Sequence, residues 1–390
     1  MYLQGKVRKR KILMQQNKNK SASRILYIDA VKAIAMISVV MFHACTNQDP
    51  YLAKKAYLIQ FLSAFAMPAF FFINGFLYKN KHIDKPAVEI WRKIKAYYGP
   101  FLIYNLVYLV LHNLFVFLHM VDAQYGNSYY DLKTYLKHFL LAITGHREFF
   151  SGALWFLESI LILNIIYIIT DYIILKIFHG QYKLTIFAIV TFLMIIAGNS
   201  GYVPQTMKLA ESCINSLYFF FGITYRELKM NSLFENKKKI FIVIGIISNL
   251  LITYNKLYNP FGCNNFVIMI GLNYVNSILG IIALILVAQI SCVQNNKMLN
   301  VIGKNTMDIM ALHFMMFKIV SFAMILYYGL SINRLAEYPV LVEIEGGWWI
   351  LYTIVGVALP TLFSVYRHKF ALKEKYFALP VRHKGEVSDE

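Results

Sequence analysis

The sequence predicts an all-α fold, a polytopic integral membrane bundle of about ten transmembrane helices in a single membrane domain. Hydrophobic residues make up 58% of the 390 residues and charged residues only 15%, far less charge than a soluble domain of this size carries. The mean hydropathy is +0.51. Apolar runs of about 17–25 residues, the length that crosses a bilayer as a helix, recur along the whole chain.

The membrane domain is expected between two polar tails. Residues 1–24 carry eight Lys and Arg and are expected to form a cytoplasmic tail, and residues 367–390 a second one. The domain between them covers 25–366. Its first span is expected at 28–46, retained rather than cleaved as a signal peptide, because Lys32 interrupts the apolar core. Nine further spans are expected at 57–78, 98–120, 154–175, 184–199, 212–226, 240–254, 266–290, 306–328 and 347–366.

The basic residues predict the orientation of these spans. If ten spans alternate from a cytoplasmic N-terminus, the inner segments hold 29 of the 39 Lys and Arg, and the outer segments hold 8. Cytoplasmic loops carry such an excess of positive charge, so we expect both termini to lie inside. The same argument accounts for the pI near 9.5 without a nucleic-acid partner. The four isolated cysteines and the absence of His/Cys/Asp clusters in the sequence predict neither a disulfide framework nor a metal site.

Asp29 to His43 is the segment most suggestive of function. It reads as an apolar helix with Asp29 and Lys32 near its start and His43 near its end. Lys32 and His43 are eleven residues apart, close to three helical turns, so they share one face about 16 Å apart along the axis. Charges inside an apolar span are costly and mark functional sites. Two interpretations follow: both side chains reach interfaces, or Lys32 holds an anionic donor whose reactive end reaches His43.

Six short motifs occur in order between about residues 24 and 366. They are Arg24 to Lys32 with His43, Phe71-Phe72-Ile73-Asn74-Gly75-Phe76, Arg92-Lys93-Ile94-Lys95 before Pro100, Leu154-Trp155-Phe156-Leu157, Phe220-Phe221-Gly222-Ile223 with Tyr225-Arg226, and Ile302-Gly303-Lys304-Asn305-Thr306 with His313. In this order they resemble the motifs of the acyltransferase-3 family of membrane O-acyltransferases, and the Asp-x-x-Lys form of the first resembles its fucose 4-O-acetylase-like subgroup. Asn74 replaces the serine that is usual in the second motif.

The resemblance implies acyl transfer, usually of acetyl from acetyl-CoA, to a hydroxyl of a cell-surface polysaccharide or its lipid-linked precursor. Acetyl-CoA or another acyl-CoA, such as succinyl-CoA, is then a co-substrate, and no permanently bound cofactor is expected. The expected partners are the acyl-CoA, the glycan and the bilayer, and a homo-oligomer is compatible with the sequence. The expected location is a bacterial plasma membrane.

The chemistry assigns roles to the remaining candidates. His43 acts either as the base on the acceptor hydroxyl or as a covalent acyl carrier. Glu158, at a similar depth, orients His43 or occupies the outer interface, and Trp155 is either an interfacial residue or a wall of the acceptor site. Lys32, Asp29, Asn74, Arg92 and Lys95 are candidates for the donor site, and His313 and Arg226 are supporting candidates. Arg92, Lys95 and Arg226 can instead be charges that flank a span at its cytoplasmic end, and His313 can be a helix-contact residue.

Two other classes of function stay open. The chain can instead be a transporter or flippase of a glycan intermediate, or an acyl relay that crosses the membrane without final transfer. Polar groups inside a helical bundle suit all three functions. The sequence shows no internal repeat, which disfavours a transporter built from inverted halves.

Overall fold

The computed structural model describes residues 25–46, 52–121, 128–204, 208–258, 266–342 and 346–377, so the expected tail at 1–24 lies outside the described residues. All regular structure in these ranges is helical, which confirms the all-α prediction. The long helices are α2 (Leu26–Cys45), α3 (Leu52–Phe76), α4 (Pro86–Val110), α7 (Trp155–Phe178), α8 (Lys183–Asn199), α9 (Leu209–Glu227), α11 (Lys238–Tyr258), α12 (Phe266–Ala288), α15 (Thr306–Tyr328) and α16 (Trp348–Phe377).

Within the described residues, seven helical segments are long and apolar enough to cross a membrane, as expected for a multi-pass membrane protein. They lie in α2, α3, α7, α11, α12, α15 and α16. The helices α4, α8 and α9 coincide with three more expected spans, but α8 is too short to be counted, with 17 residues. The total of about ten spans therefore stays a prediction.

Short helices fill several of the connections between the long ones. They are α5 (His112–Phe117), α6 (Leu132–Ile143), α10 (Asn231–Phe234), α13 (Ser291–Gln294), α14 (Lys297–Lys304) and the 3₁₀ turns η2 (Phe149–Leu154), η4 (Glu235–Lys237) and η5 (Ile332–Ala336).

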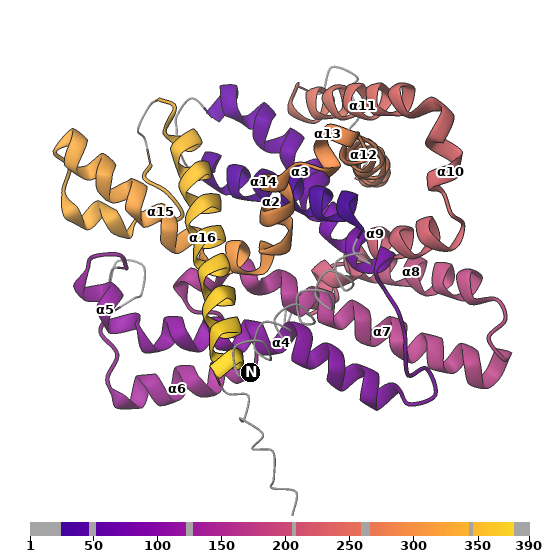
Figure 1. Cartoon of the computed structure of the whole chain (residues 1–390), viewed down its shortest axis with the longest axis horizontal. Helices are drawn as coiled ribbons and strands as arrows, with labels where there is room; N and C mark the ends of the chain where they lie inside the picture. The colour runs from indigo at the N-terminus through magenta and orange to yellow at the C-terminus, as the bar shows by residue number, and fades with distance from the viewer. Residues whose placement is uncertain are drawn as a thin grey trace, which may run out of the picture.

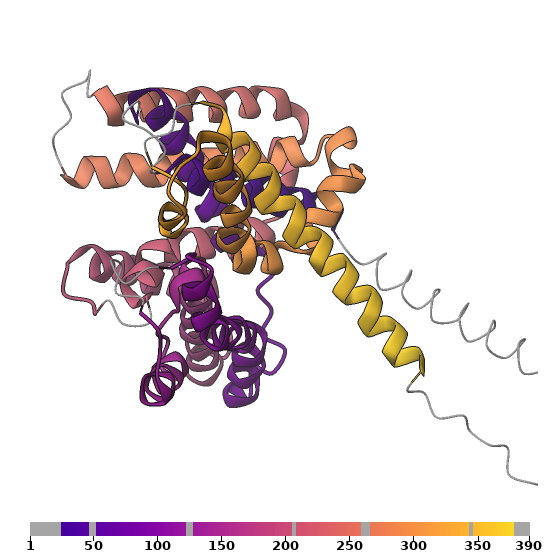
Figure 2. The same ribbon diagram turned by 90° about the vertical axis from the view of Figure 1, so that its left-hand side faces the viewer.

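Two of the expected spans differ from the helices that contain them. The helix that contains the span expected at 98–120 is α4, which begins earlier, with Pro86 in its first turn. Proline is favoured there because its missing N–H needs no partner. The helix then breaks at Leu111 before α5. At the other end of the chain, α16 continues eleven residues past the expected end of the last span, to Phe377, and projects from the other helices at the right of Figure 2.

Helix α2 lies in the middle of the molecule beside α3 and α14 (Figure 1). It also packs against α12, α15 and α16. Two glycines allow the closest approaches. A Cβ on Gly303 of α14 would lie 2.0 Å from the backbone oxygen of Asp29, and one on Gly356 of α16 would lie 2.9 Å from the side chain of Val40. The small residues of these neighbouring helices therefore fix the position of α2.

Helices α3 and α9 pack through a reciprocal pair of glycines. A Cβ on Gly75 would lie 1.8 Å from the backbone oxygen of Phe219, and one on Gly222 would lie 2.1 Å from that of Phe72. Small residues permit such close approach in membrane bundles. Further along both helices, Arg226 donates to the backbone oxygen of Phe76 at 2.9 Å. Earlier in both helices, Gln60 to Pro68 of α3 line one cavity with Ile214 to Tyr218 of α9. Early residues of α3 thus lie near early residues of α9 and late residues near late ones, so the two helices run parallel.

The course of the chain defines two ends of the bundle. The Lys32 end is where α2 begins, and the His43 end is where α2 finishes. Because α3 follows α2 after a short connection, α3 begins at the His43 end, and α9, parallel to it, begins there too. Helix α11 then leaves from the Lys32 end after the short α10 turn. Its last residues therefore lie at the His43 end.

Candidate functional site

The helix predicted from Asp29 to His43 is present as α2, and it carries His43 into the contact between α2 and α15. The His43 ring stacks on the ring of His313, with centroids 5.4 Å apart and planes 29° apart. The Phe314 ring meets His43 edge-on at 4.8 Å. The structure thus brings together two histidines that are 270 positions apart in the sequence.

The hydrogen bonds of His313 define its tautomer. Its Nδ1 lies 3.0 Å from the backbone oxygens of Ile309 and Met310. Carbonyl oxygens only accept, so Nδ1 carries the hydrogen and Nε2 is left as an acceptor in the neutral ring. The His313 side chain is fully buried, and its Nε2 has no hydrogen-bond partner among the described residues. Beside His43 there is therefore a nitrogen that can accept a proton or a hydrogen bond.

Two further charged residues of α15 serve other contacts. The Nζ atom of Lys318 donates to the backbone oxygens of Leu335 and Glu337, at 2.8 and 2.6 Å, and so anchors the η5 turn. The Asp308 carboxylate accepts from Tyr104 and Ser364 and pairs with Arg367 at 2.7 Å. These groups tie α15 to α4, α16 and the η5 turn.

At the other end of α2, Lys32 and Asp29 form the predicted pair. The Nζ atom of Lys32 lies 3.9 Å from Oδ1 of Asp29. Asp29 is 2% exposed and Lys32 is 23% exposed. Gly303 packs directly on the Asp29 backbone, which explains why a glycine is needed in the Ile302-Gly303 motif. The buried carboxylate therefore lies beside the Lys32 ammonium, whose side chain is partly exposed.

The basic residues at the start of α4 divide into outward and inward groups. Arg92 pairs with both oxygens of Glu89, and Lys95 lies over the exposed ring of Trp91, 5.1 Å from its centroid. Lys93, between them, points inward and is 8% exposed. It was not among the predicted donor residues.

Lys93 lies on the buried face of α4 that continues with Phe101 and Tyr104. Its Nζ lies 5.7 Å from the Tyr78 ring centroid and 5.9 Å from that of Tyr97. No hydrogen-bonded or ion-paired partner of this ammonium occurs among the described residues. Burial lowers the pKa of Lys93 to about 8, the positive charge of Arg92 acts in the same direction, and Glu89 opposes both. The i, i+4 periodicity of this face is the sequence signal that could have identified it.

Asn74 connects α3 to this face of α4. Its Nδ2 donates to the backbone oxygen of Phe70 at 3.0 Å, and its Oδ1 accepts from the Tyr97 hydroxyl at 2.7 Å. Asn74 therefore holds Tyr97, which in turn packs beside Lys93. Its predicted hydrogen bond to a donor thioester stays a prediction.

Glu158 is buried, but its partner is Arg147 rather than His43. No hydrogen bond joins Glu158 to His43 in the described part of the chain, and the predicted role in orienting His43 stays a prediction. Trp155, at the start of α7, lines a cavity together with residues of α3, α9, α11 and α12. Arg226 donates to the backbone oxygens of Phe76 and Tyr78 and so closes the end of α3, and its supporting role in the site stays a prediction.

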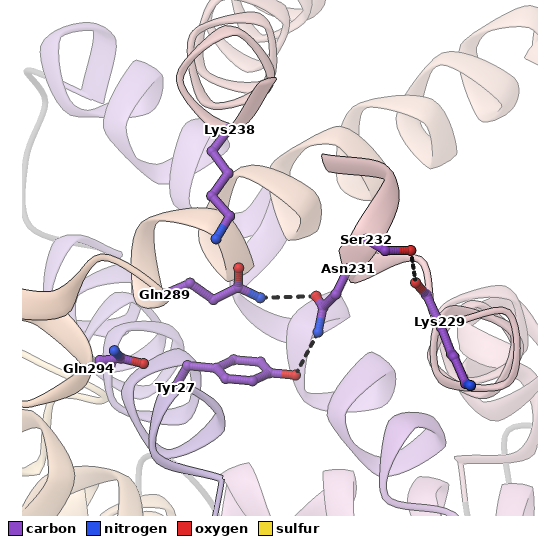
Figure 3. A pocket seen from close by; sticks show the side chains of 7 residues that line it. All are labelled: Tyr27, Lys229, Asn231, Ser232, Lys238, Gln289 and Gln294. Atoms are coloured by element: carbon purple, nitrogen blue, oxygen red, sulfur yellow. Dashed lines mark hydrogen bonds between the residues drawn. The ribbon is translucent and has the colours of Figure 1, made fainter. Parts of the chain in front are cut away.

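A second cavity, of about 480 Å³, opens at the Lys32 end (Figure 3). Asn231 lies at its centre, where it donates to the Tyr27 hydroxyl at 3.3 Å and accepts from Gln289 at 2.9 Å. The Lys238 side chain points toward Gln289, whereas that of Lys229, which also belongs to the lining, extends away from Asn231 (Figure 3). Amide groups and the Lys238 ammonium can bind a polar anionic ligand here.

Within the described residues, no group of three or more His, Cys, Asp and Glu side chains is arranged to hold a metal ion.

A family model described as an acyltransferase domain matches residues 25–367 of the chain. The comparisons with curated proteins and with solved structures gave no match. The matched range contains both histidines, the Lys32–Asp29 pair, the Lys93 face of α4 and both cavities.

Proposed function

Because the chain belongs to the acyltransferase-3 family and is therefore an acyltransferase, we propose that it transfers an acyl group across its membrane domain to a hydroxyl of a cell-surface glycan. The proposed donor is cytoplasmic acetyl-CoA, and the proposed acceptor is a polysaccharide or its lipid-linked precursor. Helix α2 carries the proposal, because it holds Lys32 at one end of the bundle and His43, stacked on His313, at the other.

His43 is the proposed reacting group. In one route its ring takes the proton of the acceptor hydroxyl as that oxygen attacks the thioester carbonyl, the C–S bond breaks and the thiolate leaves as free CoA after protonation. In the other route the ring nitrogen attacks first, CoA leaves, and the hydroxyl then attacks the acyl-imidazole. His313 positions the His43 ring in both routes.

The Lys32 end suits the donor, which carries phosphates. Lys32 and Lys93 offer ammonium groups there, and Arg92 and Lys95 lie on the outward side of α4. The cavity lined by Lys229 and Lys238 adds the ammonium of Lys238. We propose that these groups hold the phosphates, with Asn74 and Tyr97 nearer the thioester. Phosphate oxygens bind ammonium and guanidinium groups through charge-assisted hydrogen bonds.

This arrangement requires the Lys32 end to face the cytoplasm. The distribution of Lys and Arg supports that orientation, with 29 of 39 in the segments assigned to the inside. The proposed location is a bacterial plasma membrane, and the fucose 4-O-acetylase-like subgroup is part of the same proposal.

The decisive experiment replaces His43 by alanine and measures O-acyl groups on the surface glycan by NMR. We expect complete loss of O-acylation with unchanged amounts of protein in the membrane. Phe42→Ala removes the neighbouring ring and is the matched control for packing. O-acylation at the wild-type level in the His43 variant would refute the assignment. If the protein were a flippase, cells that carry the His43 variant would lack the polymer itself. If it were an acyl relay, the purified wild-type protein would form no O-acylated glycan when supplied with donor and glycan.

A further inference from the structure

A cavity of about 330 Å³, lined by both apolar and polar side chains, lies within the bundle toward the His43 end. Gln60 and Ser63, in the early turns of α3, line it together with Thr253, near the end of α11. Trp155 contributes its indole from the start of α7. All four positions belong to the helix ends that share a side with His43. The volume is in the range of small-ligand sites.

Neutral hydrogen-bonding groups dominate the polar part of this lining. Amides come from Asn215, Asn273 and Asn276, and hydroxyls from Tyr218, Thr253 and Ser277. Among the described residues that line the cavity, none is Lys, Arg, His, Asp or Glu. The cavity at the Lys32 end, by contrast, contains two lysines. The two cavities therefore differ in the charge of the ligand that they fit.

One group in the lining has an unmet hydrogen-bonding need. Asn276 is 4% exposed, and its Oδ1 has no partner among the described residues. Its backbone oxygen accepts from Asn249 at 3.3 Å, so the α12 backbone is held in place by α11. Buried polar atoms without partners are rare because they cost free energy. A ligand that reached Oδ1 and donated to it would remove that cost.

We propose that this cavity binds the acceptor, as a neutral polyhydroxylated sugar unit. Hydroxyl groups donate and accept, which matches amides that do both, and the indole of Trp155 gives the apolar face of a sugar ring a stacking surface. That the ligand is the acceptor rests on the proposed function. A polysaccharide and a lipid-linked precursor would both present the same sugar hydroxyls to this cavity.

The first test uses full-length protein in nanodiscs, radiolabelled acetyl-CoA and two acceptors from the same cells: alkali-deacylated surface polysaccharide and deacylated lipid-linked oligosaccharide. Asn276→Leu and Ser277→Ala remove hydrogen-bonding groups at little cost in volume. Because one neutral hydrogen bond corresponds to a factor of about 2–10 in binding, we expect the acceptor KM to rise by that factor in each variant. The acetyl-CoA KM stays unchanged. The acceptor with the lower KM identifies the source of the sugar.

Asn199→Leu is the matched control, because Asn199 lies in the outer turn of α8, bonds the backbone oxygen of Ile195 and does not line the cavity. If both cavity variants keep the wild-type acceptor KM while the wild type transfers acetyl, the cavity assignment is wrong and the function stands.

A binding measurement separates the cavity from catalysis. A chain with Trp91, Trp348 and Trp349 replaced by Phe reports through Trp155 alone. Titration with the deacylated polysaccharide should shift its emission saturably, and Asn276→Leu should weaken that response. If the wild type transfers no acetyl but the response is present, the proposed function fails and the sugar site stands. A flat titration overturns the sugar site.

Discussion

The Nε2 atom of His313 is a buried acceptor beside the proposed reacting group, because the His313 ring stacks on His43. Replacing His313 by asparagine removes the ring and Nε2 but keeps a donor for the helix carbonyls. Asn164 and Asn74 already make this i−4 bond elsewhere in the chain, at 2.9 and 3.0 Å. We therefore expect normal folding with kcat at least ~10-fold lower and an unchanged KM for acetyl-CoA, as for loss of a group that acts in the reaction step.

The control for this variant is His313→Phe, which keeps a ring against His43 but has no nitrogen. If its kcat matches the wild type, stacking alone is the contribution of His313. A kcat as low as that of His313→Asn assigns the contribution to Nε2. Wild-type kcat in both variants would contradict any part for His313 in the reaction.

Lys93 gives the donor site a pH dependence. Burial lowers the pKa of its ammonium to about 8, so the side chain is charged below that pH and neutral above it. An anionic donor is held by the charged form. We expect the KM for acetyl-CoA to rise as the pH increases from about 7 to about 9, and the rise to disappear in Lys93→Arg, whose guanidinium stays charged.

Lys93→Met tests the same site at constant pH and should raise the KM for acetyl-CoA by about 10-fold, the effect of about 1.4 kcal/mol in binding. Lys176→Met is the matched control, since Lys176 is exposed and its Nζ lies 5.7 Å from the Tyr172 ring centroid. Equal KM values for the two variants would remove Lys93 from the donor site.

At the scale of helices, the glycine contact between α3 and α9 determines how closely two motif segments pack. A Cβ on Gly222 meets the Phe72 oxygen at 2.1 Å and the Phe76 nitrogen at 2.5 Å, and neither backbone atom can move without its helix. Overpacking of this kind typically costs about 1–3 kcal/mol. We expect Gly222→Ala to lower the midpoint of thermal unfolding in detergent and to reduce the folded yield, with unchanged KM values in the protein that folds.

Gly271→Ala supplies the comparison for that variant, because Gly271 lies within α12 and a Cβ there meets no atom within 4 Å. Its midpoint should equal or exceed that of the wild type, since alanine favours helix more than glycine. Similar losses of stability in both variants would show that the close α3–α9 contact at Gly222 is not the cause of the loss.

The helices were largely predictable from the sequence because hydropathy is a local property of each segment. The α2 helix and its Lys32–Asp29 pair follow from spacing alone. The contact of His43 with His313 does not, because it joins α2 to α15 and depends on how the bundle packs. Basic character alone does not distinguish Lys93 from Arg92 and Lys95, because only the phase of the α4 helix places Lys93 on the buried face. Extending that face backward from Phe101 by steps of four reaches Tyr97, Lys93 and Glu89.

At the scale of the whole molecule, the cavities at the two ends of the bundle differ in the charge of their lining residues. The cavity at the Lys32 end is lined by two lysines, whereas the lining described for the cavity toward the His43 end is free of charged side chains. An acyl-CoA carries phosphates and a glycan acceptor carries hydroxyls, so the two substrates would approach from opposite sides. A hydroxyl on the outer surface can then receive an acyl group from a cytoplasmic donor only if α2 spans the bilayer between them.

This separation predicts the orientation of the chain, which cysteine labelling can measure. Cys292, in α13 at the Lys32 end, is exposed, whereas Cys45 and Cys213 are buried. In a Cys263→Ser background, a membrane-impermeant maleimide should label Cys292 in inside-out vesicles and not in right-side-out vesicles. Tyr202, between α8 and α9, is 92% exposed, and a Tyr202→Cys, Cys292→Ser chain should show the opposite pattern. If the two patterns are exchanged, the Lys32 end faces outward, and a cytoplasmic acyl-CoA cannot be the ligand of Lys32 and Lys93.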